Sequence, residues 1–295
     1  MQDIPVVLLN YNRPEFSKRL VENLAKIKPK KVYISIDGHK SNVVGDKNKV
    51  DQVETAFANI QWDCEVKLRR NEINLGLRPA VKGALDWFFA EQPFGIVLED
   101  DIAFNEHFFQ YCQRFSNLEE GSKIGAISGN NLMAHMFSKD FFQPKYLLAQ
   151  IFHCWGWATW SHRWKNYDDN IEYDDHFFQD TLPKYLNYDE KVIDFWYSVR
   201  TNIRNNAINT WALRFLLSNW KHDLYFLTPP ENLTTNHGFI EDSTHTSVMP
   251  FYMQNIQIGN FVPYEKSHYE IKTCPPFEKI EEKFILGIDR SPLLL

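Results

Sequence analysis

Residues 95–102, with the sequence Gly-Ile-Val-Leu-Glu-Asp-Asp-Ile, decide the fold. The first four are apolar and have the length of a buried strand, as is typical of a parallel sheet covered on both faces. Three acids, Glu99, Asp100 and Asp101, follow directly. Open α/β sheets bind their ligands at the carboxyl ends of the strands. The stretch therefore predicts a strand that delivers three carboxylates to a ligand-binding edge. The alternative is a solvated acidic turn.

Strand-like and helix-like segments alternate through the first half of the chain. Apolar runs predict strands at residues 5–9, 32–36, 64–68, 95–98 and 124–128. Apolar residues at helical spacing predict helices at residues 16–27, 50–60, 79–90 and 108–115. Such alternation predicts an α/β fold in which a parallel sheet is connected by right-handed crossovers.

The second half of the chain has a different composition and a less regular pattern. It is rich in Trp, Tyr and Asn, and one clear helix is predicted at residues 189–205. The tail from Pro263 onward is interrupted by prolines, and we expect it to wrap the surface. Because neither an internal repeat nor a low-complexity linker separates the halves, we expect one compact domain with an elaborated second half.

Composition excludes some classes of function. The chain has 295 residues, 44% of them hydrophobic and 24% charged, which is ordinary for a globular protein. Its net charge of -6 disfavours nucleic-acid binding, which needs a basic footprint. The four cysteines are widely scattered, without the spacing of a zinc or redox motif. No apolar stretch reaches the length of a membrane span, about 20 residues.

Polar side chains follow each of the first four predicted strands. They are Asn10 and Arg13, then Asp37, then Arg70 and Asn74, and finally the acidic triplet. The carboxyl ends of parallel strands share one edge of a sheet. Together these groups would supply cations for a diphosphate, an acid for a base or ribose, and carboxylate oxygens, which Mg²⁺ and Mn²⁺ prefer.

These motifs resemble the metal-dependent glycosyltransferases with the GT-A fold. Residues 99–102, with Phe108 and Phe109 behind them, are similar to the Glu-Asp-Asp-Leu variant of the DXD motif in the N-acetylglucosaminyltransferase I type. Asn12-Arg13 matches that family's Asp-Arg after the first strand, and Asp37 matches its Asp after the second. Lys82 lies in the helix before the acids, where the family also has a basic residue.

Two later segments resemble bacterial relatives of this family. Residues 153–164 are rich in Trp and Gly, and residues 229–246 contain Asn-His-Gly and Asp-Ser-Thr-His runs. The similarity extends from residue 6 to about residue 246. It implies an α/β fold of GT-A type (Rossmann-like), with a mostly parallel central sheet flanked by helices. The catalytic domain would span residues 1–262, with a nucleotide-sugar-binding half (1–130), an acceptor-side half (131–262) and a C-terminal extension (263–295).

The resemblance also implies roles for individual residues. Asp101 would bind Mn²⁺ or Mg²⁺, with His245 as a further ligand unless it is a hydrogen-bonded loop histidine. Donor-binding residues would be Asn10, Arg13, Asp37, Arg70, Asn74, Lys82, Glu99 and Asp100. Acceptor-side residues would be Asn130, Trp155, Trp157 and Glu231. Because core packing is the alternative for each Trp, we expect at least one of Trp155, Trp157 and Trp160 in the site and at least one buried.

The chain departs from the family at the general base. In the relatives an Asp follows a Trp at this point, whereas Trp211 is followed by Ala212 and Leu213, which cannot accept a proton. Asp242 or Glu241 could serve as a displaced base. Otherwise the enzyme could be retaining, or the chain could bind nucleotide without catalysing transfer.

The function expected from these motifs is transfer of a sugar from a nucleotide diphosphate-sugar, with UDP favoured, to a glycan or lipid-linked acceptor in bacterial surface polysaccharide synthesis. One alternative is a sugar nucleotidyltransferase, although no Gly-rich phosphate loop follows the first strand. Another is a non-catalytic glycan- or nucleotide-binding protein. We expect a cytoplasmic location and leave peripheral attachment to the inner face of the membrane open. The donor sugar, the acceptor and the oligomeric state are not specified by the sequence.

Overall fold

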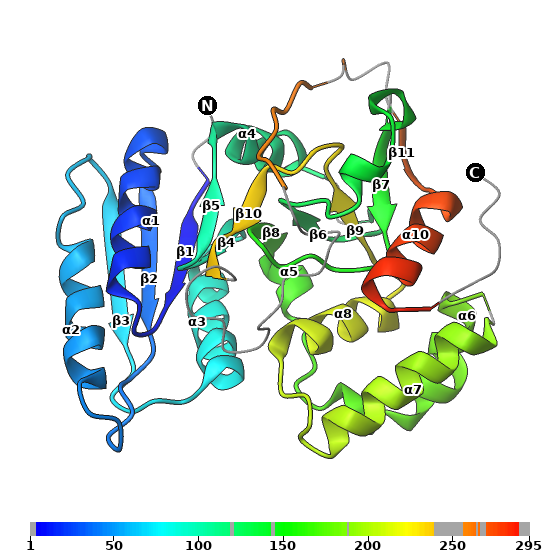
Figure 1. Ribbon diagram of the computed structural model, residues 1–295, viewed down its shortest axis with the longest axis horizontal. Coiled ribbons are helices and arrows are strands. Elements are labelled where there is room, and N and C mark those ends of the chain that lie inside the picture. The colour runs from blue at the N-terminus through cyan, green and yellow to red at the C-terminus, as the bar shows by residue number, and fades with distance from the viewer. Residues whose placement is uncertain are drawn as a thin grey trace.

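The computed structural model describes residues 4–118, 121–142, 145–187, 189–238, 256–263, 265 and 270–288. In these residues one sheet has nine strands in the order β11-β7-β9-β6-β8-β4-β1-β2-β3 (Figure 1). The strands are β1 (Val6–Asn10), β2 (Lys31–Ile36), β3 (Glu65–Arg70), β4 (Phe94–Glu99), β6 (Ile124–Ser128), β7 (Lys145–Ala149), β8 (Trp157–Trp160), β9 (Tyr225–Thr228) and β11 (Glu270–Thr273). A small second sheet pairs β5 (Ile102–Phe104) with β10 (Thr234–Asn236).

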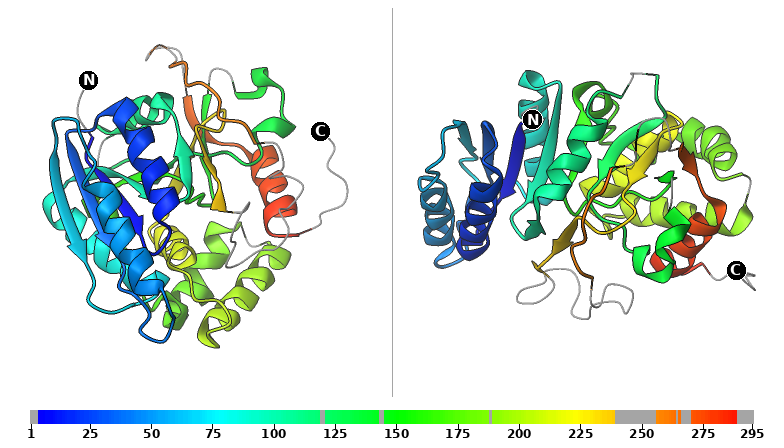
Figure 2. Two further views of the ribbon diagram at one scale, coloured as in Figure 1. Left: turned by 60° about the vertical axis from the view of Figure 1, so that its left-hand side comes forward. Right: turned by 90° about the horizontal axis from the view of Figure 1, so that it is seen from above.

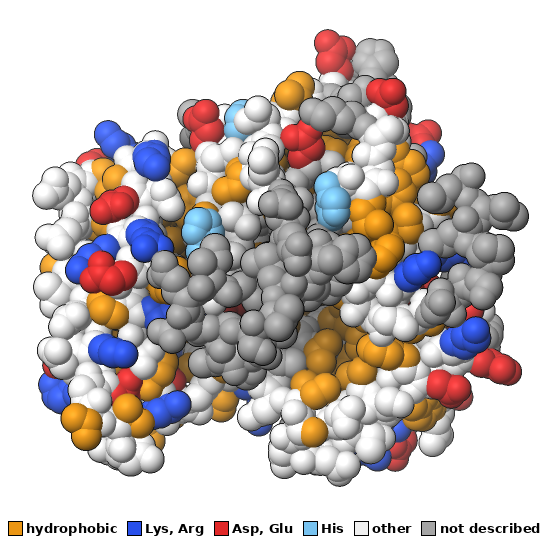
Figure 3. Space-filling view, viewed as in Figure 1, with side chains coloured by type: hydrophobic (Ala, Val, Ile, Leu, Met, Phe, Trp, Pro, Cys, Tyr) orange, Lys and Arg blue, Asp and Glu red, His pale blue; other side chains and the backbone are white. Residues whose placement is uncertain are grey.

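Helices cover both faces of the main sheet. The longer ones are α1 (Pro14–Ile27), α2 (Asp46–Phe57), α3 (Leu77–Glu91), α4 (Glu106–Phe115), α7 (Glu190–Arg204), α8 (Trp211–Lys221) and α10 (Pro275–Ile285), and two short ones are α5 (Ser161–Trp164) and α6 (Leu182–Tyr185). No described helix has the length and apolar character needed to cross a membrane. On the face shown in Figure 3, basic and acidic side chains are interspersed over α1 and α2.

Alternating residues of β1 divide the core into two layers. Val6 and Leu8 pack with α1, α2 and α4, whereas Val7 and Leu9 pack with α3 and α8. Both sets are fully or almost fully buried, as expected for a strand covered on both faces. Figure 2 shows α1 and α2 together on one face of β1, β2 and β3.

The pairing confirms an α/β fold with a mostly parallel sheet. β1 lies between β2 and β4 and is parallel to both, and β3 is parallel to β2. β6 and β9 are also parallel, as are β7 and β11. The exceptions include β8, which is antiparallel to both of its neighbours, β4 and β6. The carboxyl ends of β1, β2, β3 and β4 therefore lie along one edge.

The region after Pro263 belongs to the fold rather than wrapping its surface, so that expectation was wrong for the described part. β11 pairs with β7 in the main sheet. Phe277 and Ile280 on α10 are buried in a third core cluster with Leu132, Met133 and Phe142. An edge strand and a helix of the predicted extension thus complete the second half.

Candidate functional site

The acidic triplet lies at the end of β4, as the sequence predicts. Glu99 pairs with Leu9 of β1 in the sheet register, so the chain leaves the sheet beside the end of β1. Asp100 and Asp101 form the turn into β5. Because β5 pairs with β10, and the Asp101 carbonyl accepts a 2.9 Å hydrogen bond from the backbone N–H of His237, the turn is held from the second half of the chain.

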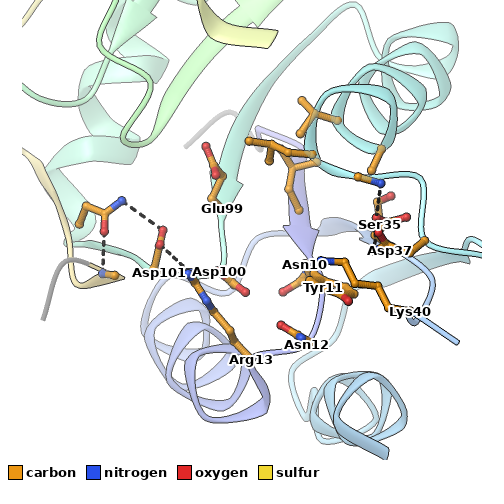
Figure 4. Close-up of a pocket in the computed structure, with 18 of the residues that line it drawn as sticks. Asn10, Tyr11, Asn12, Arg13, Ser35, Asp37, Lys40, Glu99, Asp100 and Asp101 are labelled. Carbon is orange, nitrogen blue, oxygen red and sulfur yellow. Dashed lines mark hydrogen bonds and ion pairs between the residues drawn. The ribbon is translucent and has the colours of Figure 1, made fainter. Parts of the chain in front are cut away.

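A cavity of about 630 Å³ opens where these strands end (Figure 4). Eight of the predicted site residues line it: Asn10, Arg13, Asp37, Asn74, Glu99, Asp100, Asp101 and Trp155. Its volume is in the range of ordinary ligand sites, about 300–1,000 Å³. The structure therefore brings together most of the predicted donor-side residues and one predicted acceptor-side residue.

Arg13 is an ion-pair partner of the acids. Its Nη1 lies 2.9 Å from Asp101 Oδ2 and 3.4 Å from Asp100 Oδ1. The acidic side chains are mostly buried, with Asp100 10% and Asp101 12% exposed. In Figure 4 the Glu99 carboxylate points away from Arg13. The guanidinium thus neutralises part of the negative charge at the end of β4.

One guanidinium is not enough to keep all three buried acids ionised. Burial, with the charges of Asp101 and Asp100, raises the pKa of Glu99 to about 8. Burial and Asp101 raise the pKa of Asp100 to about 7, although Arg13 opposes the shift. Burial also raises the pKa of Asp101, again against the effect of Arg13. Since burial disfavours all three carboxylates, and neighbouring acids also disfavour those of Glu99 and Asp100, a further cation would stabilise their ionised forms.

The oxygen donors suit a hard divalent cation. Carboxylates are the ligands that Mg²⁺ and Mn²⁺ prefer. Among the described residues, no group of three His, Cys, Asp or Glu side chains could hold a metal by itself. Mg²⁺ commonly takes only one or two carboxylates and completes its shell with phosphate oxygens and water. Asp100 and Asp101 therefore fit such an ion if a phosphorylated ligand accompanies it.

Asp37 organises a loop beside the cavity. Its Oδ1 accepts from the backbone N–H groups of Gly38 and Leu75 and from Asn71, at 2.9–3.0 Å. Its Oδ2 accepts from the Asn74 amide at 2.9 Å and from the Gly76 N–H at 3.1 Å. Five donors occupy the carboxylate, so Asp37 acts on the cavity by holding residues 71–76 in place. Direct contact with a base stays a prediction.

A second buried acid, Asp46, is one that the sequence analysis missed. It is 3% exposed at the start of α2. Its side chain accepts hydrogen bonds of 2.6 Å from the Tyr11 hydroxyl and the Asn12 amide, and 2.7 Å from the Lys40 N–H. All three donors belong to residues that line the cavity. An acid in the first turn of a helix is a recognisable signal, but the sequence analysis began this helix only at residue 50, four residues too late.

The second half also contributes Asn236 and Gly238. The Asn236 amide donates to Asp101 Oδ1 at 3.3 Å and accepts from the Gly238 N–H at 2.6 Å. A Cβ at Gly238 would lie 2.2 Å from Asp101 Oδ2, so only glycine fits this close approach. The Asn-His-Gly segment quoted from the sequence thus reaches the acids.

Two predicted donor-side cations lie outside the cavity. Arg70 forms ion pairs of 2.7 Å with Asp51 and Glu54 of α2. Lys82 pairs at 2.6 Å with Asp86, one turn further along α3. Neither lines the cavity, because each is held by a helix residue close to it in space.

Three predicted acceptor-side residues are also placed elsewhere. Trp157 is fully buried and stacks on Trp211, with ring centroids 5.4 Å apart. Its assignment to the acceptor side was therefore wrong, because a core ring cannot meet a ligand. Asn130 is 1% exposed and does not line the cavity. Glu231 accepts a 3.3 Å hydrogen bond from the backbone N–H of Asn260.

The tryptophans divide as expected between site and core. Trp155 is partly buried and lines the cavity, whereas Trp157 and Trp160 are buried. The candidate bases Glu241 and Asp242 and the candidate ligand His245 lie outside the described residues. Ala212 and Leu213 lie in the first turn of α8, packed against the core.

No family model matches the sequence, and no curated protein matches it. Among solved structures, two crystal structures of HddC from Yersinia pseudotuberculosis, one of them complexed with GMP-PN, are similar to part of the chain. Their identities are 12% and 11%, and each match covers 54% of this chain and 77% of the HddC chain with a TM-score of 0.34. A similarity this low does not establish a common fold or function.

Proposed function

We propose that the protein is a nucleotide-sugar-dependent glycosyltransferase of the GT-A type. One observation carries the proposal. The acids at residues 99–101, the guanidinium of Arg13 and the loop that Asp37 holds all line a single cavity at the carboxyl edge of the sheet. That edge is where open α/β sheets bind nucleotides. The cavity combines cationic, acidic and amide groups, as a charged and hydroxylated ligand requires.

The donor in this proposal is a nucleotide diphosphate-sugar, with UDP favoured. Arg13 contacts the diphosphate, because a guanidinium binds phosphate oxygens in a bidentate manner. The loop of residues 71–76 and the side chain of Tyr11 form the part of the cavity wall that contacts the nucleoside. Trp155 comes from the second half and offers an aromatic face to a sugar.

The chemistry supplied by a bound Mn²⁺ or Mg²⁺ is stabilisation of the negative charge on the departing nucleoside diphosphate. Asp100 and Asp101 are the residues that would hold it. Arg13 adds a fixed positive charge next to the same leaving group. Asn236 orients the Asp101 carboxylate from the second half of the chain.

Proton transfer from the acceptor hydroxyl is assigned to a displaced base. The structure has alanine and leucine at positions 212 and 213, so no carboxylate reaches the acceptor from the first turn of α8. Asp242 and Glu241 remain the candidates, and the acceptor is a glycan or lipid-linked sugar. A retaining reaction would need no base at that position.

Nucleotide binding and transfer test this function. The purified protein is titrated with UDP and GDP in the presence of Mn²⁺ or EDTA, and is then incubated with UDP-sugars and GDP-sugars while nucleotide release is followed. We expect metal-dependent binding of one nucleotide and slow release of it from the matching sugar donor. Absence of metal-dependent binding to every nucleotide would overturn the proposal. Release of pyrophosphate from a nucleoside triphosphate plus a sugar 1-phosphate would identify a nucleotidyltransferase instead.

A further inference from the structure

Arg13 occupies the position where the proposed cation would act. Its Nη1 lies between the two acids of the turn, 2.9 Å from Asp101 Oδ2 and 3.4 Å from Asp100 Oδ1. Asp101 Oδ1 accepts from Asn236 at 3.3 Å, so both oxygens of this carboxylate already have donors. A divalent cation that approached Asp101 would meet a guanidinium a few ångströms away. Because the pair is mostly buried, water screens the repulsion only weakly.

Arg13 can leave the acids without unfolding the helix. It is the residue before α1, and its side chain does not cap that helix. The side chain is 26% exposed, and its guanidinium lies 5.6 Å from the centroid of the Phe16 ring on α1. A diphosphate in the cavity would offer this guanidinium oxygen acceptors of higher charge than a carboxylate.

We propose that Arg13 is an internal counter-ion of Asp100 and Asp101. Its guanidinium prevents divalent cations from binding there until a nucleoside diphosphate enters the cavity and pairs with the guanidinium instead. The inference rests on the proposed function, since it assumes that the cavity binds a nucleotide. When Arg13 exchanges the two carboxylates for the diphosphate, Asp100 and Asp101 become available to the cation. Cation and nucleotide therefore bind cooperatively, and the empty site does not take up a bare cation tightly.

The Arg13→Gln variant separates the two roles of this side chain. It removes the competing charge, so Mn²⁺ without nucleotide should bind about tenfold more tightly than to the wild type, within the usual range of coupling between sites. It also removes the phosphate partner, so UDP (or GDP, whichever the wild type binds) should bind about tenfold more weakly in EDTA. Mere damage to the site would weaken both ligands. The opposite signs are therefore the signature of an exchanging counter-ion.

The experiment titrates Mn²⁺ alone, followed by electron paramagnetic resonance, and the nucleotide in EDTA, followed by calorimetry. Lys18→Gln is the matched control, because Lys18 is an exposed cation on α1 that pairs with Glu15. It should leave both affinities unchanged. If Arg13→Gln does not fold, Arg13→Met replaces it, because methionine also lacks the charge and the hydrogen-bond donors of arginine. Arg13→Met should then give changes of the same two signs.

The outcomes distinguish this inference from the function itself. A wild type that binds neither UDP nor GDP with Mn²⁺ contradicts the proposed function. A wild type that binds metal and nucleotide, with an Arg13 variant whose Mn²⁺ affinity is unchanged or lower, overturns the counter-ion role and leaves the function standing. Tighter Mn²⁺ binding together with weaker nucleotide binding supports the inference.

Discussion

At the residue scale, the acids of β4 differ in their surroundings although they are neighbours in sequence. Asp101 is held by Arg13, by Asn236 and by the close approach of Gly238. Glu99 faces away from Arg13, and its pKa is raised most clearly by burial. The site thus has one well-anchored carboxylate that is suited to a fixed role at a leaving group.

Asp101→Asn keeps the size of this side chain and removes its charge. We expect the rate of transfer to fall about 10²–10³-fold, the usual effect of losing one preorganised electrostatic contact at a reacting group. Metal-dependent nucleotide binding should weaken in parallel in calorimetry. Asp63→Asn is the control, because the Asp63 side chain is fully exposed. Equal binding and transfer by Asp101→Asn and the wild type would remove Asp101 from the site.

Trp155 and Trp157 should respond differently to truncation. Trp157→Ala leaves a large cavity in the core and should lower the free energy of unfolding by about 3–5 kcal/mol. Trp155→Ala should weaken acceptor or donor binding and lower stability less, because its ring is partly exposed at the cavity. Urea denaturation and ligand titration of both variants check this. A stable Trp157→Ala protein would contradict the burial of that ring.

The part of the site that follows directly after the parallel strands could be predicted from the sequence. Asn10, Arg13, Asp37, Asn74 and the acids converge because parallel strands end at one edge. Arg70 and Lys82 could not be excluded in advance, since their partners lie on helix faces whose rotation the sequence does not specify. The contribution of Asn236 depends on the pairing of β10 with β5, two short strands that are distant in sequence.

At the scale of elements, long segments with clear periodicity were predicted within a few residues. The helices predicted at 16–27 and 189–205 correspond to α1 and α7, and the five predicted strands all form, as β1, β2, β3, β4 and β6. α8 was missed; most of its residues are buried, the polar Arg214, Ser218 and Asn219 among them. β5, β8, β10 and β11 have only three or four residues each, too few for a period to show. Their structure comes from distant pairing.

The packing of α10 should depend on pH through Glu278. Burial, followed by the charges of Glu281 and Glu282, raises its pKa to about 7 in the folded state from 4.5. The folded state therefore binds this proton more tightly than the unfolded state, and stability falls as pH rises from about 4.5 to 7. Burial, with the charge of Glu278 among the further causes, also raises the pKa of the nearby Tyr185 and Tyr225.

Glu278→Gln removes this titration. The variant should melt at a higher temperature than the wild type at pH 8, with little difference near pH 4.5, in thermal unfolding followed by circular dichroism. Glu22→Gln, at an exposed position on α1, is the control and should change the melting temperature little at either pH. A gain that is the same at both pH values would point to packing rather than charge.

At the scale of the whole molecule, the cavity joins the two halves of the chain. Its walls come from residues 9–13 and 99–101 and from parts of segments 35–40 and 74–81 on one side, and from Trp155, Asn236 and Gly238 on the other. A ligand held by both sets of residues would stabilise the folded state as a unit.

Thermal unfolding should therefore report ligand binding. At a ligand concentration of 100 times Kd, the folded state gains about 2.7 kcal/mol, which corresponds to a rise of several degrees in the melting temperature. We expect this rise with Mn²⁺ plus the matching nucleoside diphosphate, a much smaller rise with either alone, and reversal by EDTA. Adenosine is the control for non-specific binding. A melting curve that no combination of metal and nucleotide shifts would argue against a nucleotide site.

The placement of β8 has a consequence for biosynthesis. This strand fills the space between β4 and β6, but it is translated after both of them. Until it emerges from the ribosome, β4 presents an apolar outer edge with no hydrogen-bonding partner, because residues 94–98 are all buried only in the finished sheet. Bare apolar edges recruit strands from other molecules. We therefore expect fragments that stop before Trp157 to aggregate more readily than the full chain.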